Sequence, residues 1–328
     1  MKIAITGAGA LGTAHARAAR EWGAEVTFIH DARLSAAQTL AAGVGAVAID
    51  NLEEIFVRQL DGLIVATPPP IRLDPITLAC RHGVHLFVEK PPAYNLEQGR
   101  QCLEEIEKAG VMAAVGFNLR YDRRYAQLRD IIGDEPVHLV RTVCTIDYYL
   151  NFGMSPWFLQ KRVSGGPIAE QAIHLLDCVR FLFGNAQATR ALACGTKNMA
   201  PHRPEFDAEN ALQIIYELDN GIYATHMNHC GHDRFHFDLE VVGPHLRLHA
   251  NITEPNIHGY YRDSAIDVPV VGNDAQGGRL QVWLQAVRSG DASLIRSPFA
   301  DALCTQALVD AAVRSQSTAQ FEKVESVR

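Results

Sequence analysis

Three glycines near the start of the chain have the spacing of a phosphate-binding turn. Gly7, Gly9 and Gly12 stand in G-x-G-x-x-G register in "KIAITGAGALGTAHARAAREWG", between an apolar run and an alanine-rich stretch. Gly7 permits a tight turn, Gly9 lets a pyrophosphate approach the backbone, and Gly12 allows a helix to pack closely on a strand. Asp31 ends the next apolar run, where the dinucleotide fingerprint requires an acid for the ribose hydroxyls. The pattern predicts a dinucleotide site.

The residues around this turn bear on which dinucleotide binds. Asp31 would repel a 2′-phosphate and therefore favours NAD. Arg33, two residues later, would either attract that phosphate or lie in solvent at a helix start. Ala10 and Leu11 open the helix and would offer backbone amides to the cofactor. The sequence favours NAD and leaves NADP open.

Two further apolar runs end in residues suited to a ligand site. In "GLIVATPPPIR" the apolar run stops before Thr67, Pro68 and Pro69, which hold a loop extended at the carboxyl edge of a sheet, where ligands of open α/β folds bind. These three residues are expected to line the cofactor cleft. "GVHLFVEKPPAYN" stops abruptly at Glu89 and Lys90, before two prolines. A surface lysine paired with its neighbouring glutamate is the simplest interpretation of that pair.

A polar stripe follows one predicted helix. "SGGPIAEQAIHLLDCVRFLFG" opens with a glycine turn and a proline suited to a first helical position, and Gly184 suits a helix end. Glu170, His174 and Asp177 stand at i, i+4 and i+7 and therefore share one face. Such a stripe is typical of a solvated face. An imidazole that titrates near neutral pH also suits a general acid or base.

The elements that would position these residues alternate through the first third of the chain. Strands are expected at 2–6, 25–30, 62–67, 84–89 and 112–117, and helices at 11–21, 33–43, 52–59, 73–82 and 95–109. Strands that alternate with helices imply a parallel sheet covered on both faces.

From about residue 120 the pattern changes to a series of strands. After the polar-stripe helix, strands are expected at 187–194, 209–218, 221–230, 235–242 and 245–250. The turns in "LDNGIY" and "VVGPHLRL" make neighbouring strands antiparallel. We predict a dinucleotide-binding α/β domain over residues 1–118. The second domain, 119–328, should be α+β with a large, open, mainly antiparallel sheet that binds substrate and makes oligomer contacts.

Composition narrows the class of protein. The chain has 328 residues, 48% of them hydrophobic, and a formal net charge of −7. This charge, without any run of Lys and Arg, argues against nucleic acid as a partner. No apolar segment approaches the length of a membrane helix, which favours a cytoplasmic protein without a membrane partner. The seven cysteines are scattered and include no C-x-x-C pair, as expected for reduced thiols.

Five motifs together resemble one family. "GAGALG", "VATPPP", "GVHLFVEKPPA", "VGFNLRY" and "SGGPIAEQAIHLLD" occur in the order and spacing of the Gfo/Idh/MocA oxidoreductases (glucose-fructose oxidoreductase and inositol dehydrogenase-like proteins), across essentially the whole chain. The resemblance implies a Rossmann domain followed by an open-faced sheet domain. It also implies NAD(P)-dependent hydride transfer to or from sugars, polyols and related cyclic alcohols or ketones.

The resemblance also implies roles for the polar residues. Glu89 and Lys90 would lie beside the nicotinamide and contact the cofactor. Lys90, often with a cis bond to Pro91, would also stabilise charge on the substrate oxygen. Glu170 and His174 match the family's acid-x-x-x-His, with His174 as general base or acid and Glu170 as the orienting group. Asp is commoner than Glu at this position of the family.

Residues of a substrate pocket follow from the same resemblance. Arg120, Tyr148, Trp157 and Asp177 are the candidates. Arg72 stands where many members have His; it would meet an anionic group of the substrate or lie in solvent.

The sequence also bears on an alternative function, on a metal site and on the oligomeric state. The family includes regulators that keep the fold without turnover, so a non-catalytic NAD(P)-binding sugar sensor is the alternative function. His226, His229, His232 and His236 crowd one hairpin, but strand alternation separates the first two and no metalloenzyme spacing fits, so no metal is expected. Apolar residues on both faces of "ALQIIYEL" and "FHFDLEVV" predict a homodimer or homotetramer through the sheet.

Overall fold

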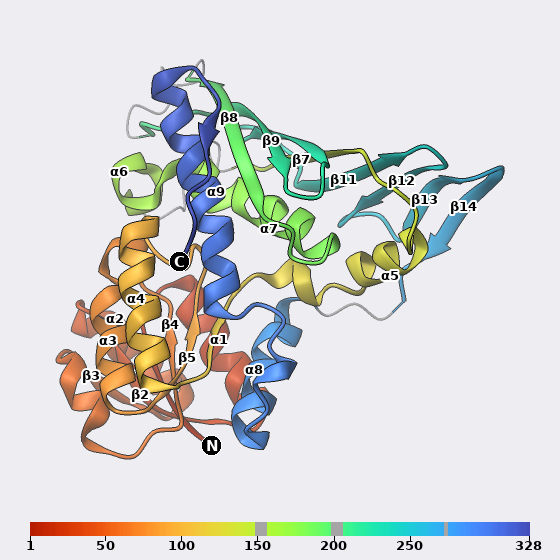
Figure 1. Ribbon diagram of the computed structural model, residues 1–328. Helices are drawn as coiled ribbons and strands as arrows, with labels where there is room; N and C mark the ends of the chain where they lie inside the picture. The colour runs from red at the N-terminus through yellow and green to blue at the C-terminus, as the bar shows by residue number, and fades with distance from the viewer. Residues whose placement is uncertain (148–155, 198–205, 272–274) are drawn as a thin grey trace. The chain divides into compact units, whose positions relative to one another are not determined.

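The computed structural model describes residues 1–147, 156–197, 206–271 and 275–328 (Figure 1). The chain forms two compact units. The first contains Met1–Asn118 and Gln276–Leu303, and the second contains Leu119–Ala275 and Cys304–Arg328. The sequence predicts a single boundary after residue 118, whereas 276–303 returns to the first unit. The division of labour between cofactor and substrate binding stays a prediction.

The first unit is built on a six-stranded sheet with the order β3-β2-β1-β4-β5-β6. Every neighbouring pair is parallel, which gives the doubly wound order of dinucleotide-binding folds. The strands are β1 (Lys2–Thr6), β2 (Glu25–His30), β3 (Val47–Ile49), β4 (Gly62–Val65), β5 (His85–Val88) and β6 (Ala113–Val115). The predicted parallel sheet is confirmed. Strand β3 was missed because three residues are too few to show a periodic pattern.

Helices accompany these strands in the first unit. They are α1 (Ala10–Glu21), α2 (Leu34–Val44), α3 (Leu73–Arg81), α4 (Leu96–Ala109) and α8 (Ala275–Ser289), with 3₁₀ turns η1 (Leu52–Val57), η2 (Pro69–Ile71) and η7 (Ala292–Leu294). Helix α4 begins where the Asn95 side chain accepts a hydrogen bond from the Gln98 amide at 2.9 Å, and it ends at Gly110, whose φ is 65°. The helix predicted at 52–59 is the 3₁₀ turn η1.

Helix α8 completes the core of the first unit from late in the chain. Trp283 is fully buried, and its ring lies 5.8 Å from the ring of Phe87 on β5. Arg288, in the last turn of α8, donates to the Trp22 carbonyl at the end of α1 at 2.8 Å. Figure 1 shows α8 beside α1. The first unit is therefore complete only when residues far apart in the sequence have come together.

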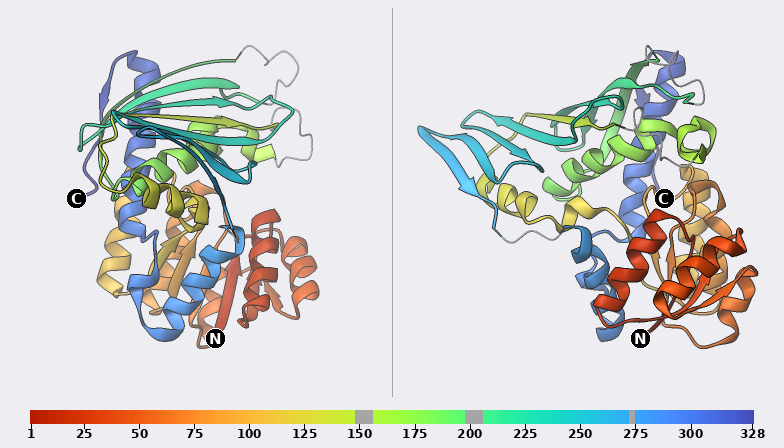
Figure 2. Two further views of the ribbon diagram at one scale, coloured as in Figure 1. Left: turned by 90° about the vertical axis from the view of Figure 1, so that its right-hand side faces the viewer. Right: turned by 180° about the vertical axis from the view of Figure 1, so that it is seen from behind.

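The second unit contains a nine-stranded sheet with the order β14-β13-β12-β11-β7-β10-β9-β8-β15 (Figure 2). Its neighbours are antiparallel except for β7 and β10, which are parallel. The strands are β7 (Leu139–Thr145), β8 (Ala188–Thr196), β9 (Ala211–Leu218), β10 (Tyr223–His229), β11 (His236–Gly243), β12 (Leu246–Asn251), β13 (Asn256–Tyr261), β14 (Ser264–Pro269) and β15 (Glu322–Lys323). The predicted mainly antiparallel sheet is confirmed.

The helical elements of the second unit lie on one face of this sheet (Figure 2). They are η3 (Asn118–Tyr121), α5 (Arg123–Ile132), η4 (Pro156–Leu159), α6 (Lys161–Ser164), the π-helical turn η5 (Ile168–Ala172) and α7 (Ile173–Leu182), and α9 (Phe299–Thr318) continues from the first unit into the second. Among the described helices, none is both long and apolar enough to cross a membrane.

The two faces of the nine-stranded sheet differ in polarity. On β11, Phe237, Leu239 and Val241 are buried under the helices. The residues between them, such as Asp238, point to the open face. The sequence predicts apolar residues on both faces of β9 and β11, but the open face of β11 carries mainly polar and charged side chains. An apolar side chain such as Ile215 on β9, 40% exposed, is found farther along the same face.

The contact between Gly62 and Trp283 predicts a stability difference. A Cβ at Gly62 would lie 2.6 Å from the Trp283 ring, whereas a Cβ at Gly43 in α2 would meet no atom within 4 Å. Gly62→Ala should lower the free energy of unfolding by about 1 to 3 kcal/mol through overpacking. The control, Gly43→Ala, should raise it by about 0.5 kcal/mol because alanine favours the helix. Urea unfolding measures both, and equal stabilities would contradict the packing of α8 on β4.

Candidate functional site

The glycine turn between β1 and α1 forms a cradle that is tightly packed at Gly7 and Gly12 and open at Gly9. Gly7 has φ of 99°, and a Cβ on it would lie 2.6 Å from the Ala66 carbonyl oxygen. A Cβ on Gly12 would lie 1.8 Å from the Gly7 carbonyl oxygen, so only glycine permits this contact. A Cβ on Gly9 would meet no atom within 4 Å. The turn thus has its open side at Gly9, where a pyrophosphate must approach.

The start of α1 is suited to an anion. Gly9 occupies the N-cap and has no side chain to satisfy the amides that follow it. Ala10 and Leu11 are exposed, Leu11 by 44% although it is a large apolar side chain. Amides at a helix N-terminus bind phosphate groups through hydrogen bonds and the helix dipole.

Asp31 ties the end of β2 to the glycine turn. Its Oδ2 accepts from the Ala8 amide at 2.8 Å, and its Oδ1 accepts from the Arg33 amide at 2.9 Å. The Asp31 carboxylate therefore lies against the cradle, where each oxygen retains a lone pair for a ribose hydroxyl. The Arg33 side chain is 75% exposed, with its Nε 3.6 Å from Asp31 Oδ1. These residues fit the pyrophosphate and adenosine ribose of NAD.

Thr67 follows β4 and lies beside the same turn. The Cβ position of Gly7 is 2.9 Å from the Thr67 amide nitrogen. The Thr67 side-chain oxygen is buried and has no hydrogen-bond partner among the described residues. A buried hydroxyl without a partner is costly, so a ligand group at this position would be stabilising. Pro68 and Pro69 continue this loop into η2.

Lys90 follows β5 at the carboxyl end of the parallel sheet. The Glu89 amide still bonds to the Val65 carbonyl at 2.9 Å, and the Lys90–Pro91 peptide bond is cis, as the resemblance implies. The Lys90 amide donates to Oε2 of the preceding residue, Glu89, at 3.1 Å. The Glu89 side chain therefore lies against the backbone of this turn. The Lys90 side chain is half-buried.

The carboxylate of Glu89 is buried and paired with two basic side chains. It is 1% exposed, and its Oε1 lies 2.6 Å from His15 Nε2 on α1 and 3.0 Å from Arg279 Nη2 on α8. Burial alone would raise the pKa of Glu89, but Arg279 and His15 outweigh it and hold that pKa well below the ordinary value. The predicted contact of Glu89 with the cofactor is corrected, because its carboxylate binds His15 and Arg279 within the first unit.

Arg72 is buried, which corrects both interpretations of it from the sequence. Arg72 is 3% exposed, and its guanidinium donates to the Thr67 carbonyl from Nε at 3.0 Å and from Nη2 at 2.8 Å. Nη1 donates to the carbonyls of Glu89 and Pro91. Arg72 is therefore neither a solvated arginine nor a substrate ligand. It links the loop after β4 to the turn that carries Lys90.

The polar stripe of the second unit begins in a π-helical turn. Gly165 and Gly166 have φ of 80° and 71°, and the π-helical residues Ile168–Ala172 lead into α7. Glu170 is 4% exposed, while His174 is half-buried, with its ring 5.8 Å from that of Phe237. Single π turns occur often at functional sites. The stripe is not a solvated face.

Asp177 and Arg120 form a buried ion pair, which corrects their prediction as substrate ligands. Both side chains are 0% exposed, and Arg120 donates from Nε and Nη2 to the two carboxylate oxygens at 2.7 and 2.6 Å. The Thr305 hydroxyl on α9 donates to the same carboxylate at 2.8 Å. Arg120 and Asp177 thus join η3 to α7. Of the other pocket candidates, Trp157 is half-buried and Tyr148 lies outside the described residues.

The histidines of the β10–β11 hairpin do not converge. His226 is buried on the helix-covered face, shares a hydrogen bond with the Thr142 hydroxyl at 2.9 Å, and has its pKa lowered by burial to about 4. The ring centroids of His229 and His232 are 6.5 Å apart, and those of His232 and His236 are 6.2 Å apart.

Both units match models of one known family. The model described as "Oxidoreductase family, NAD-binding Rossmann fold" matches residues 1–117, and the "GFO/IDH/MocA C-terminal domain" matches 126–248. The chain belongs to the Gfo/Idh/MocA oxidoreductases. The first unit is therefore an NAD-binding Rossmann domain of this family.

Named relatives within the family span nearly the whole chain. An inositol 2-dehydrogenase of Rhizobium meliloti (strain 1021) is 26% identical over 328 residues, covering 96% of each chain. The scyllo-inositol 2-dehydrogenase (NAD(+)) of Bacillus subtilis (strain 168) is 26% identical over 310 residues, covering 90% of this chain and 88% of the relative. The fold is shared with GenD2 from gentamicin A biosynthesis in complex with NAD, at a TM-score of 0.85, 19% identity and coverage of 99% and 97%.

Sequence reasoning missed the residues that support Lys90. Arg279 is 190 positions from Glu89, and His15 lies within an alanine-rich helix with no motif of its own. A buried acid after a strand indicates that partners exist, but not which residues they are.

Removal of the Glu89 charge should destabilise the protein in a pH-dependent way. Glu89→Gln leaves Arg279 buried without its counter-charge and should lower the free energy of unfolding by about 3 to 5 kcal/mol at neutral pH. Because the folded pKa of Glu89 lies below its ordinary value of 4.5, the wild type holds this stabilisation above that pH and loses it as pH falls toward the lowered pKa. Urea unfolding of both proteins from neutral to acid pH should show the gap narrowing.

The exposed acid Glu97 on α4 supplies the control. It pairs with Arg100 at 3.9 Å and is 71% exposed, so Glu97→Gln should leave stability nearly unchanged. A Glu89→Gln protein as stable as the Glu97→Gln protein would contradict the proposed importance of the buried charge.

Proposed function

We propose that this protein is an NAD-dependent dehydrogenase that oxidises a secondary hydroxyl of a sugar, polyol or related cyclic alcohol, or reduces the matching ketone. The observation that carries the proposal is the link between the glycine turn and Lys90. Helix α1 starts at the cofactor cradle, and its His15 binds Glu89, the residue before Lys90. A cofactor cradle and a lysine at strand ends of one sheet suit hydride transfer. Relatives named inositol 2-dehydrogenase support the substrate class.

The preference for NAD follows from Asp31. Its carboxylate lies against the cradle and would bind the adenosine ribose hydroxyls while repelling a 2′-phosphate. Arg33 is exposed and would have to leave Asp31 to bind such a phosphate. NAD, when bound, supplies the acceptor for the hydride at its nicotinamide ring.

The side chains of this chain would handle the proton and the charge. His174 accepts the proton of the substrate hydroxyl, and Glu170, four residues earlier, orients the imidazole. The Lys90 ammonium stabilises the negative charge that develops on the same oxygen as the hydride leaves the carbon. In the reverse direction His174 returns the proton to the oxygen. Trp157 is proposed as an apolar wall for the substrate ring, and Tyr148 stays a prediction.

We also propose a homo-oligomer assembled through the open face of the nine-stranded sheet. Leu139, Ile215 and Tyr223, on the central strands β7, β9 and β10, are 54%, 40% and 38% exposed. Exposed apolar side chains on a sheet face are typical of subunit contacts. Sedimentation velocity of the full chain checks this, and a monomer at high concentration would contradict it.

Substitution of the proposed reaction residues should separate chemistry from cofactor binding. With NAD or NADP and a panel of inositols, sugars and glucosides, absorbance of the reduced nicotinamide should rise with NAD. Lys90→Met and His174→Ala should each lower kcat by about 10²- to 10⁴-fold. Calorimetry should show NAD affinity nearly unchanged, because neither side chain belongs to the glycine cradle.

Two results would change the conclusion. A His174→Ala protein that keeps normal turnover would contradict the role of the imidazole. Calorimetric binding of NAD without turnover of any compound in the panel would favour the sensor over the enzyme.

Arg72 should act as a positioning residue for Lys90. Arg72→Leu keeps the apolar volume but removes the donors to the carbonyls of Thr67, Glu89 and Pro91. A misplaced Lys90 should lower kcat by about 10- to 100-fold while KM for NAD changes little. The control Arg81→Leu, at the exposed end of the same helix α3, should leave kcat unchanged. If Arg72→Leu lowers only the unfolding midpoint and leaves kcat intact, Arg72 is a structural residue alone.

A further inference from the structure

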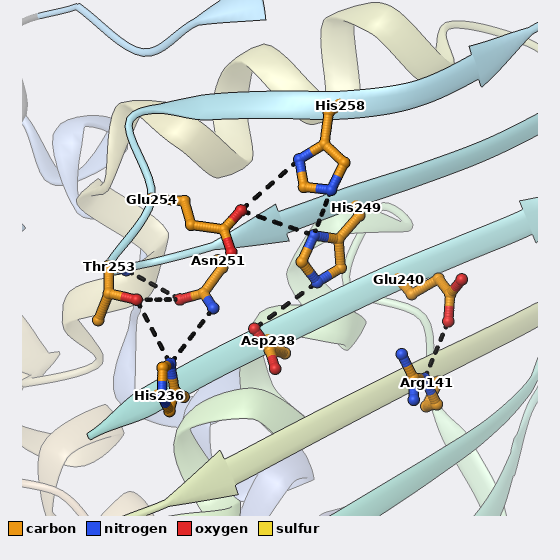
Figure 3. A network of polar contacts seen from close by, with 9 residues as sticks. All are labelled: Arg141, His236, Asp238, Glu240, His249, Asn251, Thr253, Glu254 and His258. Atoms are coloured by element: carbon orange, nitrogen blue, oxygen red, sulfur yellow. Dashed lines mark hydrogen bonds and ion pairs between the residues drawn. The ribbon is translucent and has the colours of Figure 1, made fainter. Parts of the chain in front are cut away.

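Two histidines face each other across strands β12 and β13. His249 and His258 are directly paired in the antiparallel register, and the turn between the strands brings Glu254 to the same place (Figure 3). Their neighbours Leu248 and Ile257 are fully buried, so strand alternation turns both imidazoles to the open face of the sheet. The side chains of His249 and His258 are 23% and 47% exposed.

The distances between these groups approach those of a metal centre. His249 Nδ1 lies 3.1 Å from His258 Nε2, while Glu254 Oε2 lies 3.6 Å from His258 Nδ1 and 4.0 Å from His249 Nδ1. One ligand atom from each residue falls within 4.8 Å of the others. Two nitrogens bound to one tetrahedral Zn²⁺ are about 3.3 Å apart, given bonds of about 2.0 to 2.1 Å. The two histidine nitrogens, which share a hydrogen bond at 3.1 Å, are already close to this spacing. Glu254 is 43% exposed, so its side chain has room to rotate toward them.

A second carboxylate lies beside the other ring nitrogen of His249. Asp238 on β11 has its Oδ1 3.6 Å from His249 Nε2, on the far side of the ring from Glu254 (Figure 3). A carboxylate at one ring nitrogen favours the proton there and leaves the lone pair of the other nitrogen for a metal. Such a carboxylate–histidine arrangement is the usual outer shell of a metal site.

The arginines near the cluster are paired with other acids. Arg124, whose Nη2 donates to the Glu254 carbonyl at 2.8 Å, pairs with Asp122 at 3.4 Å. Arg141 and Arg247, on the same face of the sheet, both bind Glu240, at 2.9 and 2.6 Å. The carboxylates of Asp238 and Glu254 thus stand beside two imidazoles rather than beside these arginines. Two imidazoles and one carboxylate select Zn²⁺ and similar divalent ions over Ca²⁺ or Mg²⁺, which prefer oxygen ligands alone.

We propose that His249, His258 and Glu254 bind a divalent ion of the zinc class, with Asp238 as the orienting residue and the remaining position open to water. The ion would join β12, β13 and the turn between them, near the β14 edge of the sheet. The proposal is independent of the proposed dehydrogenase activity, because none of these residues takes part in it.

Zinc titration of the tag-free, chelator-treated full chain tests the site. Calorimetry should show one equivalent of Zn²⁺ bound, and the midpoint of thermal unfolding should rise with Zn²⁺ concentration, because the ion binds only the folded state. His249→Gln, His258→Gln and Glu254→Gln should each weaken this binding at least tenfold, and Asp238→Asn should weaken it by about 10- to 100-fold. Co²⁺ in place of Zn²⁺ should give the visible absorption of a low-symmetry site.

His138→Gln is the matched control, since His138 is an exposed histidine just before β7 in the same unit. It should bind Zn²⁺ as the wild type does. Absence of both a binding heat and a thermal shift in the wild type would overturn the proposal. Zinc binding that survives all four substitutions would also overturn it, because the ion would then lie elsewhere. Glu254→Gln, in an exposed turn, keeps the test valid if a histidine variant fails to fold.

Discussion

The buried carboxylate of Glu89 is the constraint on which the first unit depends. An ionised carboxylate removed from water costs several kcal/mol unless it is paired and hydrogen-bonded. Here it is satisfied by His15 from the first helix and Arg279 from the helix that returns near the end of the chain. The charge can be buried only when α1, β5 and α8 are all in place. The residue that follows it, Lys90, therefore has a fixed backbone position at the end of β5.

The same turn is held from a second direction by Arg72. Its guanidinium offers several donors in a rigid plane, and the carbonyls of Thr67, Glu89 and Pro91 accept them. Thr67 lies beside the glycine turn, so the cradle, the loop after β4 and the lysine turn form one connected set of backbone positions. A proline-rich turn without regular hydrogen bonding is thereby made rigid by side chains. In the second unit, the buried ion pair between Arg120 and Asp177 likewise joins two elements, η3 and α7.

The sequence was informative where function depends on local backbone geometry. The glycine turn that opens a helix and the alternation of strands and helices depend on short-range spacing, and the structure contains both. Strands β13 and β14 escaped prediction because "NIHGYY" and "SAIDVP" lack a clean apolar alternation on a sheet edge. The sequence did not indicate which charged side chains bind one another in the folded protein. The sequence suggested surface or ligand positions for Arg72, Asp177 and Glu89. Each is buried instead, because groups elsewhere in the chain form its hydrogen bonds or ion pairs.

Isotope transfer would show whether this chain moves a hydride from a polyol carbon to NAD. The full chain would be incubated with NAD and myo-inositol deuterated at its ring carbons, with deuterated glucosides in parallel, and the nicotinamide examined by proton NMR. We expect deuterium at C4 of the reduced nicotinamide with at least one of these compounds. Reduced nicotinamide that lacks the label, or no reduction by any of them although NAD is bound, would contradict this expectation.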